Sequence, residues 1–134
     1  MATSFNINKK AISETATLHL VDPITEEKLY ADEAEKFPLQ IVLKGKASKE
    51  YISSLATVKR KTDARGKSDF KQQMADNNEL LALVSVEALN FDLGDGVPIK
   101  TKEQFTALYS SLDLYWVRDQ VSDFLGAKDS FSIK

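Results

Sequence analysis

The chain has 134 residues, of which 43% are hydrophobic and 28% are charged, and its formal net charge is −2. This length and composition suit one domain over 1–134 with a packed core that needs no disulfide or metal to stabilise it. The absence of cysteine excludes disulfides, thiolate zinc sites and cysteine nucleophiles, and the single histidine argues against a histidine-rich metal site.

The N-terminal third has the character of β-structure. Residues 1–13 are predicted to form an arm, and a β region is expected over 14–47. Apolar and polar residues alternate over 15–21, which is typical of a strand with one buried face. Further strands are expected at 27–31 and 39–43, so the region predicts a hairpin or a small three-stranded antiparallel sheet.

Helical spacing begins after the β region and is expected over 48–126, before a tail at 127–134. Ser48 is a good N-cap for a first helix. The helical pattern fails over the charged segment 59–67, which predicts a mobile loop or a frayed helix end. A second helix is expected over 68–90, with a buried stripe made of Phe70, Met74, Leu81, Val84 and Ala88.

Two shorter helices are predicted at the C-terminal end. Thr101 and Gln104 have the spacing of a capping box, so a third helix begins at Thr101. Asp113 is expected to cap a fourth helix that stops at Gly126. The third helix is predicted to bury Phe105, Leu108, Tyr109 and Leu112. The fold class is therefore α+β, with a small N-terminal antiparallel sheet on about four helices.

The near-neutral total charge divides into two opposite blocks. Residues 14–35 carry seven acids and one base, and residues 44–71 carry nine bases and three acids, or about −6 and +6. Three interpretations are open: both blocks are solvated surface, they face each other within one monomer, or they drive head-to-tail self-association. The candidate residues for self-association are Glu26, Glu27 and Glu33 on one side and Lys44, Lys46 and Lys49 on the other.

No pattern of catalytic, cofactor-binding or metal-binding residues is present. His19 lies within a predicted strand, where a hydrogen-bonded or exposed sheet histidine is favoured over a catalytic triad. The segment 92–98 has the composition of a turn rather than the ligand spacing of a calcium loop. We therefore expect a non-enzyme without cofactors, although an enzyme with an unrecognised site is a remaining alternative. Because no apolar run or leader pattern points to a membrane or to export, a cytoplasmic protein is expected.

Two features indicate possible binding surfaces. The basic segment 59–71 predicts either a solvated loop or, as an alternative function, a small nucleic-acid-binding module, although it lacks interleaved aromatic residues. Tyr115 and Trp116 lie beside the apolar stripe of the fourth helix, where aromatic residues either extend the core or mark an interface. With Tyr109, they cluster near one helix–helix joint, which is where a groove for a helical partner is expected.

Three stretches, in this order, resemble the tail assembly chaperones of long-tailed phages and prophages, the lambda-like siphophages among them. The first is ETATLHLVDP at 14–23, and the second is LQIVL at 39–43 followed by ASKEY at 47–51. The third lies at 105–125 and contains Phe105, the pair Leu108-Tyr109, then WVRDQV at 116–121, then Phe124 and Leu125, and it is followed by Phe131. The basic middle, 59–71, has no counterpart in the resemblance.

The resemblance implies a non-catalytic chaperone of phage tail assembly. Such proteins bind the long, helical tape measure protein and keep it soluble in the host bacterial cytoplasm, and they are absent from the mature virion. A frameshifted longer form commonly recruits the tail tube protein. The resemblance also implies a homo-oligomer, as a ring or a spiral along the client. The candidate residues for partner binding are Tyr109, Tyr115, Trp116 and Arg118.

Overall fold

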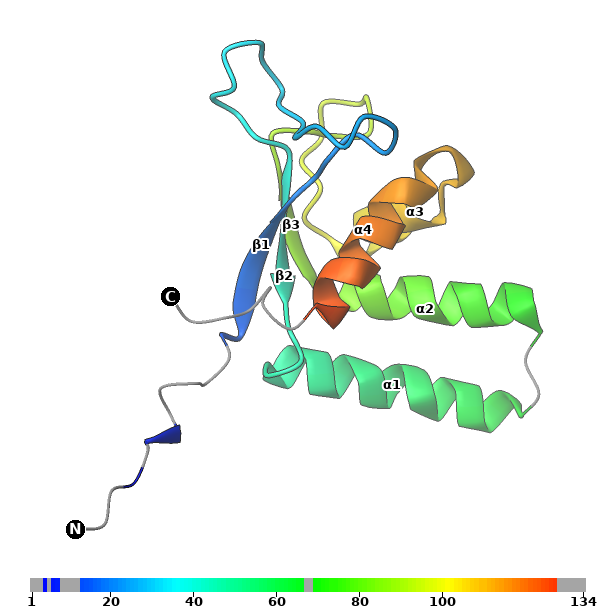
Figure 1. The fold of residues 1–134 in the computed structure, drawn as a ribbon. Coiled ribbons are helices and arrows are strands. Elements are labelled where there is room, and N and C mark those ends of the chain that lie inside the picture. Colours follow the sequence, from blue (N-terminus) through cyan, green and yellow to red (C-terminus); the bar gives the residue numbers. More distant parts are fainter. Residues whose placement is uncertain (1–3, 5, 8–12, 67–68, 128–134) are drawn as a thin grey trace.

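A computed structural model describes residues 4, 6–7, 13–66 and 69–127. Within these residues the chain forms a three-stranded antiparallel sheet and four α-helices, so the predicted α+β class is confirmed (Figure 1). The helices lie on one side of the sheet (Figure 1). Most of the expected arm at 1–13, and all but the first residue of the expected tail at 127–134, lie outside the described residues.

The sheet has the strand order β1-β2-β3. Strands β1 (Thr15–His19) and β2 (Gln40–Lys44) pair antiparallel, as the alternating pattern predicts. Ile41 of β2 faces Leu18 of β1 and Ala88 of the third strand, and these three residues belong to the core or pack against it. Alternation thus directs one face of the sheet toward the helices, and the other face mixes polar residues such as Thr17 and Glu87 with Val42 and Leu89.

The expected strand at 27–31 is not part of this sheet. The connection between β1 and β2 instead contains two isolated bridges, Val21–Lys28 and Tyr30–Pro38. It projects from the end of the sheet opposite to the beginning of helix α1 (Figure 1).

The third strand comes from a part of the sequence where a helix was expected. Helix α2 (Phe70–Val84) ends six residues earlier than predicted, and β3 (Ser85–Leu89) follows it directly. The helix over 68–90 is therefore wrong in its last part. Residues 80–89 are apolar nearly all round because both the end of α2 and β3 lie against the core. Ser85 is the C-cap of α2: its amide donates to the Ala82 carbonyl, and its hydroxyl donates to the Leu81 carbonyl at 2.7 Å.

Helix α1 (Lys49–Arg65) is longer than the sequence predicts. Ser48 caps it, with its hydroxyl accepting from the Tyr51 amide at 3.0 Å. The expected mobile loop or frayed end over 59–67 is wrong for 59–65, which are helical. Lys61 and Arg65 form ion pairs with Glu79 and Asp76 of α2, so a distant helix supplies the partners that the local sequence lacks.

Helices α3 (Lys102–Ser110) and α4 (Tyr115–Gly126) complete the fold. The capping box of Thr101 and Gln104 is confirmed. The predicted cap at Asp113 is wrong, because Asp113 lies inside a short 3₁₀ turn (Leu112–Leu114) and α4 begins without a side-chain cap. Leu112, which was expected to be buried, is 86% exposed on this turn.

One hydrophobic core lies between the sheet and helices α2, α3 and α4. Its members come from every strand and from these helices, with Ile99 added from the segment before α3. The most deeply buried side chains are Leu20, Ile41, Leu43, Val84, Ile99, Phe105, Leu108, Tyr109 and Val121. Helix α1 contributes Tyr51 at the edge of this core and otherwise packs against α2.

Candidate functional site

The candidate residues for self-association lie at opposite ends of the sheet. The acidic residues Glu26, Glu27 and Glu33 are exposed on the β1–β2 connection, at the end of the sheet where β2 begins. Lys46 and Lys49 are exposed near the start of α1, beyond the other end of β2, and Lys44 is half-buried at the end of β2 itself (Figure 1). Among the described residues, no acid of the connection forms an ion pair. The two blocks therefore do not neutralise each other within one monomer.

The four aromatic and basic residues predicted to bind a partner lie in different surroundings. Tyr109 is 1% exposed, and its hydroxyl is 2.6 Å from the Ser85 hydroxyl. Burial raises the pKa of Tyr109 well above its usual value, against the smaller opposing effect of the Ser85 hydrogen bond. Tyr109 is therefore a core residue that links α3 to the start of β3, and it is not available on the surface.

Trp116 and Tyr115 lie at the start of α4 with different exposures. Tyr115 is 56% exposed, whereas Trp116 is half-buried against the core and so extends it. Trp116 also lines an apolar hollow of about 190 Å³, which we call the Trp116 cavity. Its other lining residues are Leu20, Leu39, Phe91, Asp92, Leu93, Leu108, Leu114 and Val117.

Arg118 points to a different part of the surface from Trp116. It lies 3.4 Å from Asp119 and lines a hollow between α2 and α4, together with Phe70, Met74, Asn77, Asn78 and Ser122. Because successive helical residues are about 100° apart, two positions along α4 are enough to separate Arg118 from Trp116. The structure thus brings Trp116 and Tyr115 together and places Arg118 elsewhere.

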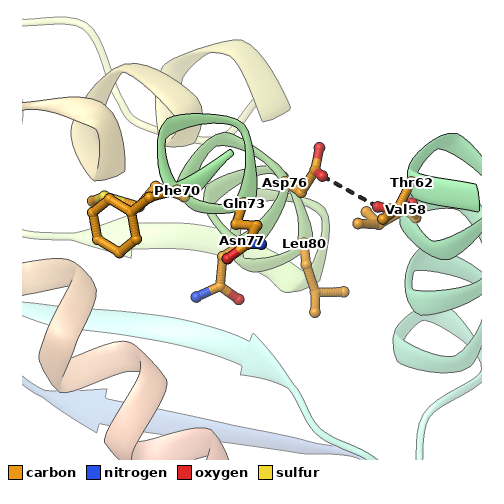
Figure 2. Close-up of a pocket in the computed structure, with 8 residues that line it drawn as sticks. Val58, Thr62, Phe70, Gln73, Asp76, Asn77 and Leu80 are labelled. Carbon is orange, nitrogen blue, oxygen red and sulfur yellow. Dashed lines mark hydrogen bonds between the residues drawn. The ribbon is translucent and has the colours of Figure 1, made fainter. Parts of the chain in front are cut away.

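One hollow of the structure was missed by sequence reasoning. It measures about 440 Å³ and lies between α1 and α2, with Asn77 and Leu80 pointing into it from α2 and Val58 and Thr62 facing it from α1 (Figure 2). It adjoins the hollow that Arg118 lines and a third one of about 160 Å³ near Lys46, Tyr51, Leu125 and Gly126. We call these three adjoining hollows the α2 groove, since α2 forms the floor and Asn77 lines all three.

Apolar side chains are unusually accessible along this groove. Phe70, which was expected within a buried stripe of α2, is 76% exposed at the end of the groove farthest from the sheet. Met74 and Leu80 line the groove from α2 and are half-buried, and Ile52 and Leu55 are exposed elsewhere on α1, outside the lining of the three hollows. Exposed apolar residues grouped in a concave surface are typical of an interaction site.

A polar network fixes the wall of the groove to its floor. Asp76 of α2 accepts hydrogen bonds from the Thr62 hydroxyl at 3.1 Å and the Gln72 amide at 3.3 Å, and it pairs with Arg65. Burial opposes ionisation of Asp76, but these hydrogen bonds and the Arg65 charge outweigh it, so the pKa of the carboxyl lies below its usual value. The ionised carboxylate therefore holds the outer ends of α1 and α2 together.

The groove also contains a polar atom without a partner. Asn78 is 7% exposed, and its Oδ1 atom accepts no hydrogen bond from the described residues. Leaving a buried acceptor unsatisfied costs about 1–3 kcal/mol. Asn78 lines the α2–α4 part of the groove beside Asn77.

Other parts of the structure offer little chemistry. The His19 ring nitrogen Nε2 lies 2.9 Å from the Leu29 carbonyl oxygen, as expected for a hydrogen-bonded sheet histidine. Asp92 and Asp95 accept from the amides of Gly94 and Val97, which is turn chemistry. Over the described ranges, no group of three or more histidine, cysteine or acidic residues could hold a metal ion. No helix in that part of the chain has the length and apolar character needed to cross a membrane.

The sequence pattern WVRDQV contains a residue whose structural role could not be foreseen. The Gln120 side chain accepts from the Val21 amide at 3.0 Å and donates to the Val21 carbonyl at 2.8 Å. This paired contact joins α4 to the residue two positions after β1. The two residues are 99 positions apart in the sequence, and a glutamine within a helical pattern does not predict such a contact.

No protein-family model, no curated protein and no solved structure matches this chain.

Proposed function

We propose that this chain is a tail assembly chaperone of a long-tailed phage or prophage, which binds the tape measure protein and keeps it soluble while the tail tube assembles. The proposal rests on the ordered resemblance of 14–23, 39–51 and 105–125. One observation supports treating these stretches as a unit: they adjoin in the fold. Strands β1 and β2 pair with each other, and Gln120 binds the backbone of Val21. Because the three stretches lie together in the fold, they can act as one unit, and this supports the proposal.

In this proposal the chain is not an enzyme and needs no cofactor. It acts in the host bacterial cytoplasm and leaves before the virion is complete. A longer frameshifted form would recruit the tail tube protein. Many copies along one long client would hold it through avidity, with no single tight site required.

Self-association is the second element of the proposal. An acidic end and a basic end on one molecule suit a head-to-tail contact, which generates a ring or a spiral. Sedimentation at rising salt tests this contact: association should weaken as salt increases. Glu26→Lys with Glu27→Lys should abolish association, and Lys46→Glu with Lys49→Glu should do the same. An equimolar mixture of the two variants should associate again, whereas a wild-type monomer at low salt and high concentration contradicts the contact.

Co-expression with the tape measure protein of the same genome tests the function itself. The tape measure protein should be soluble and recovered in a complex when this chain is present, and aggregated when it is absent. Equal solubility in both cases, with no complex on purification, would end the chaperone proposal.

A nucleic-acid-binding module is the second candidate function, and one observation favours it. Lys49, Lys59 and Arg60 are exposed on α1 and form no ion pair among the described residues. Phosphate contacts by such residues predict an affinity that falls steeply with salt. Binding of a labelled duplex and a labelled single strand, measured at two salt concentrations, tests this alternative. Lys59→Glu with Arg60→Glu should abolish it.

A further inference from the structure

The α2 groove has the shape and length to hold one helix. Its floor runs from Phe70 to Leu81, which is about 16 Å or three turns of α-helix. Its walls are α1 and α4, and they converge where Tyr51 of α1 and Gly126 of α4 line the same hollow. Figure 2 shows Asn77 and Leu80 pointing from α2 into the part of the groove that Val58 and Thr62 of α1 also line. A helix lying on α2 would fill this space as a third neighbour of α1 and α4.

The accessible side chains require an apolar stripe on the occupant. Phe70 stands at the open end, Met74 and Leu80 lie along the floor, and Leu55 lies on α1 one turn before the lining residue Val58. Grooves of this kind bind amphipathic helices, whose apolar residues recur every three to four positions.

The charged residues around the groove determine which charges a bound helix should carry beside its apolar stripe. Asp76 is paired with Arg65, and Asp119 is paired with Arg118. On the α1 side, Lys46 lines the groove, and Lys59 is exposed on α1 one turn after Leu55. Neither lysine forms an ion pair among the described residues, so acidic residues on the occupant would complement them.

The α4 side of the groove offers polar groups that can form hydrogen bonds with an occupant. Asn77 of α2 is exposed and lines all three hollows, and Ser122 of α4 is exposed and lines two of them. Polar side chains of an occupant would therefore face α4, while its acidic side chains face α1.

We propose that the α2 groove binds one amphipathic helix of about three turns, with an apolar stripe on α2 and acidic residues toward α1. The inference rests on the proposed function in that the helix would be a segment of the tape measure protein. A second copy of this chain is a poor occupant. Its described helices α2, α3 and α4 use their apolar faces in the core, and α1, which exposes Ile52 and Leu55, is basic.

Anisotropy of fluorescein-labelled synthetic peptides tests the groove without the natural client. The probe is a 15-residue helical peptide with a leucine stripe and one glutamate flank, and its matched partner has lysine in place of each glutamate. The glutamate peptide should bind at least tenfold more tightly than the lysine peptide. Lys46→Glu with Lys59→Glu should reverse this preference. Equal binding of the two peptides, or no binding of either, overturns the proposal.

Variants of exposed groove residues locate the binding site. Phe70→Ala with Leu55→Ala should weaken the glutamate peptide at least tenfold, and Asn77→Arg should block it, because Asn77 lines all three hollows. Leu112→Ala is the matched control, since Leu112 is as exposed but lies on the turn before α4. Unchanged binding by the groove variants would refute the assignment.

The same variants separate this inference from the proposed function. If the tape measure protein is solubilised equally by the wild type and by Asn77→Arg, the groove assignment fails and the chaperone proposal stands. If the peptide binds and the client is not solubilised, the groove stands and the chaperone proposal fails.

Discussion

The Trp116 cavity and the α2 groove are two hollows that residues of α4 help to line, and they differ in which residues form the rest of their walls. Leu20, Leu108 and Val117 of the Trp116 cavity are core residues that are almost fully buried. The α2 groove also has buried residues in its lining, such as Val58 and Leu81, but most of its lining residues lie outside the core, and Phe70 is 76% exposed. A hollow inside the core is tied to folding, whereas a hollow among exposed side chains is free to serve binding. Membership of the hydrophobic core, rather than aromatic content, therefore distinguishes the two hollows.

The largest contrast is expected in stability. Leu108→Ala removes a buried side chain beside the Trp116 cavity and should lower the free energy of unfolding by about 2–5 kcal/mol. Phe70→Ala in the groove should change it by no more than about 0.5 kcal/mol, as for exposed substitutions. Urea unfolding followed by circular dichroism measures both. Similar losses in the two variants would show that the groove is part of the core.

A smaller loss is expected for Tyr109→Phe. The change deletes the hydroxyl that lies 2.6 Å from Ser85 and leaves the ring in place against Phe105. Losing one net hydrogen bond should cost about 0.5–1.5 kcal/mol. The same urea experiment measures it. Client binding should be unchanged. A loss of client binding without a loss of stability would instead indicate that Tyr109 contacts the client.

The Asp76 network lies on the groove side of the comparison. We expect it to make a pH-dependent contribution to the free energy of unfolding. Because the folded-state pKa of Asp76 lies below its usual 3.8, the network stabilises the fold above about that pH and is lost as the pH falls through the folded pKa. Asp76→Asn should therefore lower the urea midpoint at pH 7, and the difference from wild type should vanish in acid. Asp63→Asn, at an exposed aspartate of α1, is the control and should leave the midpoint unchanged. A difference that persists at low pH would contradict this account.

The smallest effect is expected for Tyr115→Ala. Tyr115 is exposed beside the Trp116 cavity, so its loss should alter stability by no more than about 0.5 kcal/mol. If the groove holds the client, solubility of the co-expressed tape measure protein should also be unchanged. A client that aggregates with Tyr115→Ala and remains soluble with Phe70→Ala would transfer the binding site to the start of α4.

Local sequence patterns predicted the elements that depend on residues close together in the sequence. The alternation in β1 and the Thr101 capping box depend on neighbouring residues, and both were predicted correctly. The strand at 85–89 was missed because its five residues, SVEAL, fit a helix as well as a strand, and pairing with β2 decides between them. The helical conformation of 59–65 was missed because Glu79 and Asp76 neutralise two of its bases from another helix.

The candidate site was harder to predict than the fold. Phe70 falls at helical spacing with Leu81 and Val84, and this spacing alone places it in a buried stripe. In the structure the neighbouring helices cover the C-terminal half of that stripe and leave Phe70 exposed. The groove itself depends on how α1, α2 and α4 are arranged, and no single stretch of sequence contains that information.

The direct junction between α2 and β3 has a mechanical consequence. Val84 is the last residue of the helix and Ser85 the first of the strand, so no loop separates them. Ser85 is held at once by the Leu81 carbonyl and the Tyr109 hydroxyl. Rotation of α2 would therefore strain a strand that is hydrogen-bonded to β2 and, through Ala88, to Ile99. Any change in the width of the groove must consequently arise from displacement of α1 or α4. Helix α2, which forms the floor, stays fixed relative to the sheet.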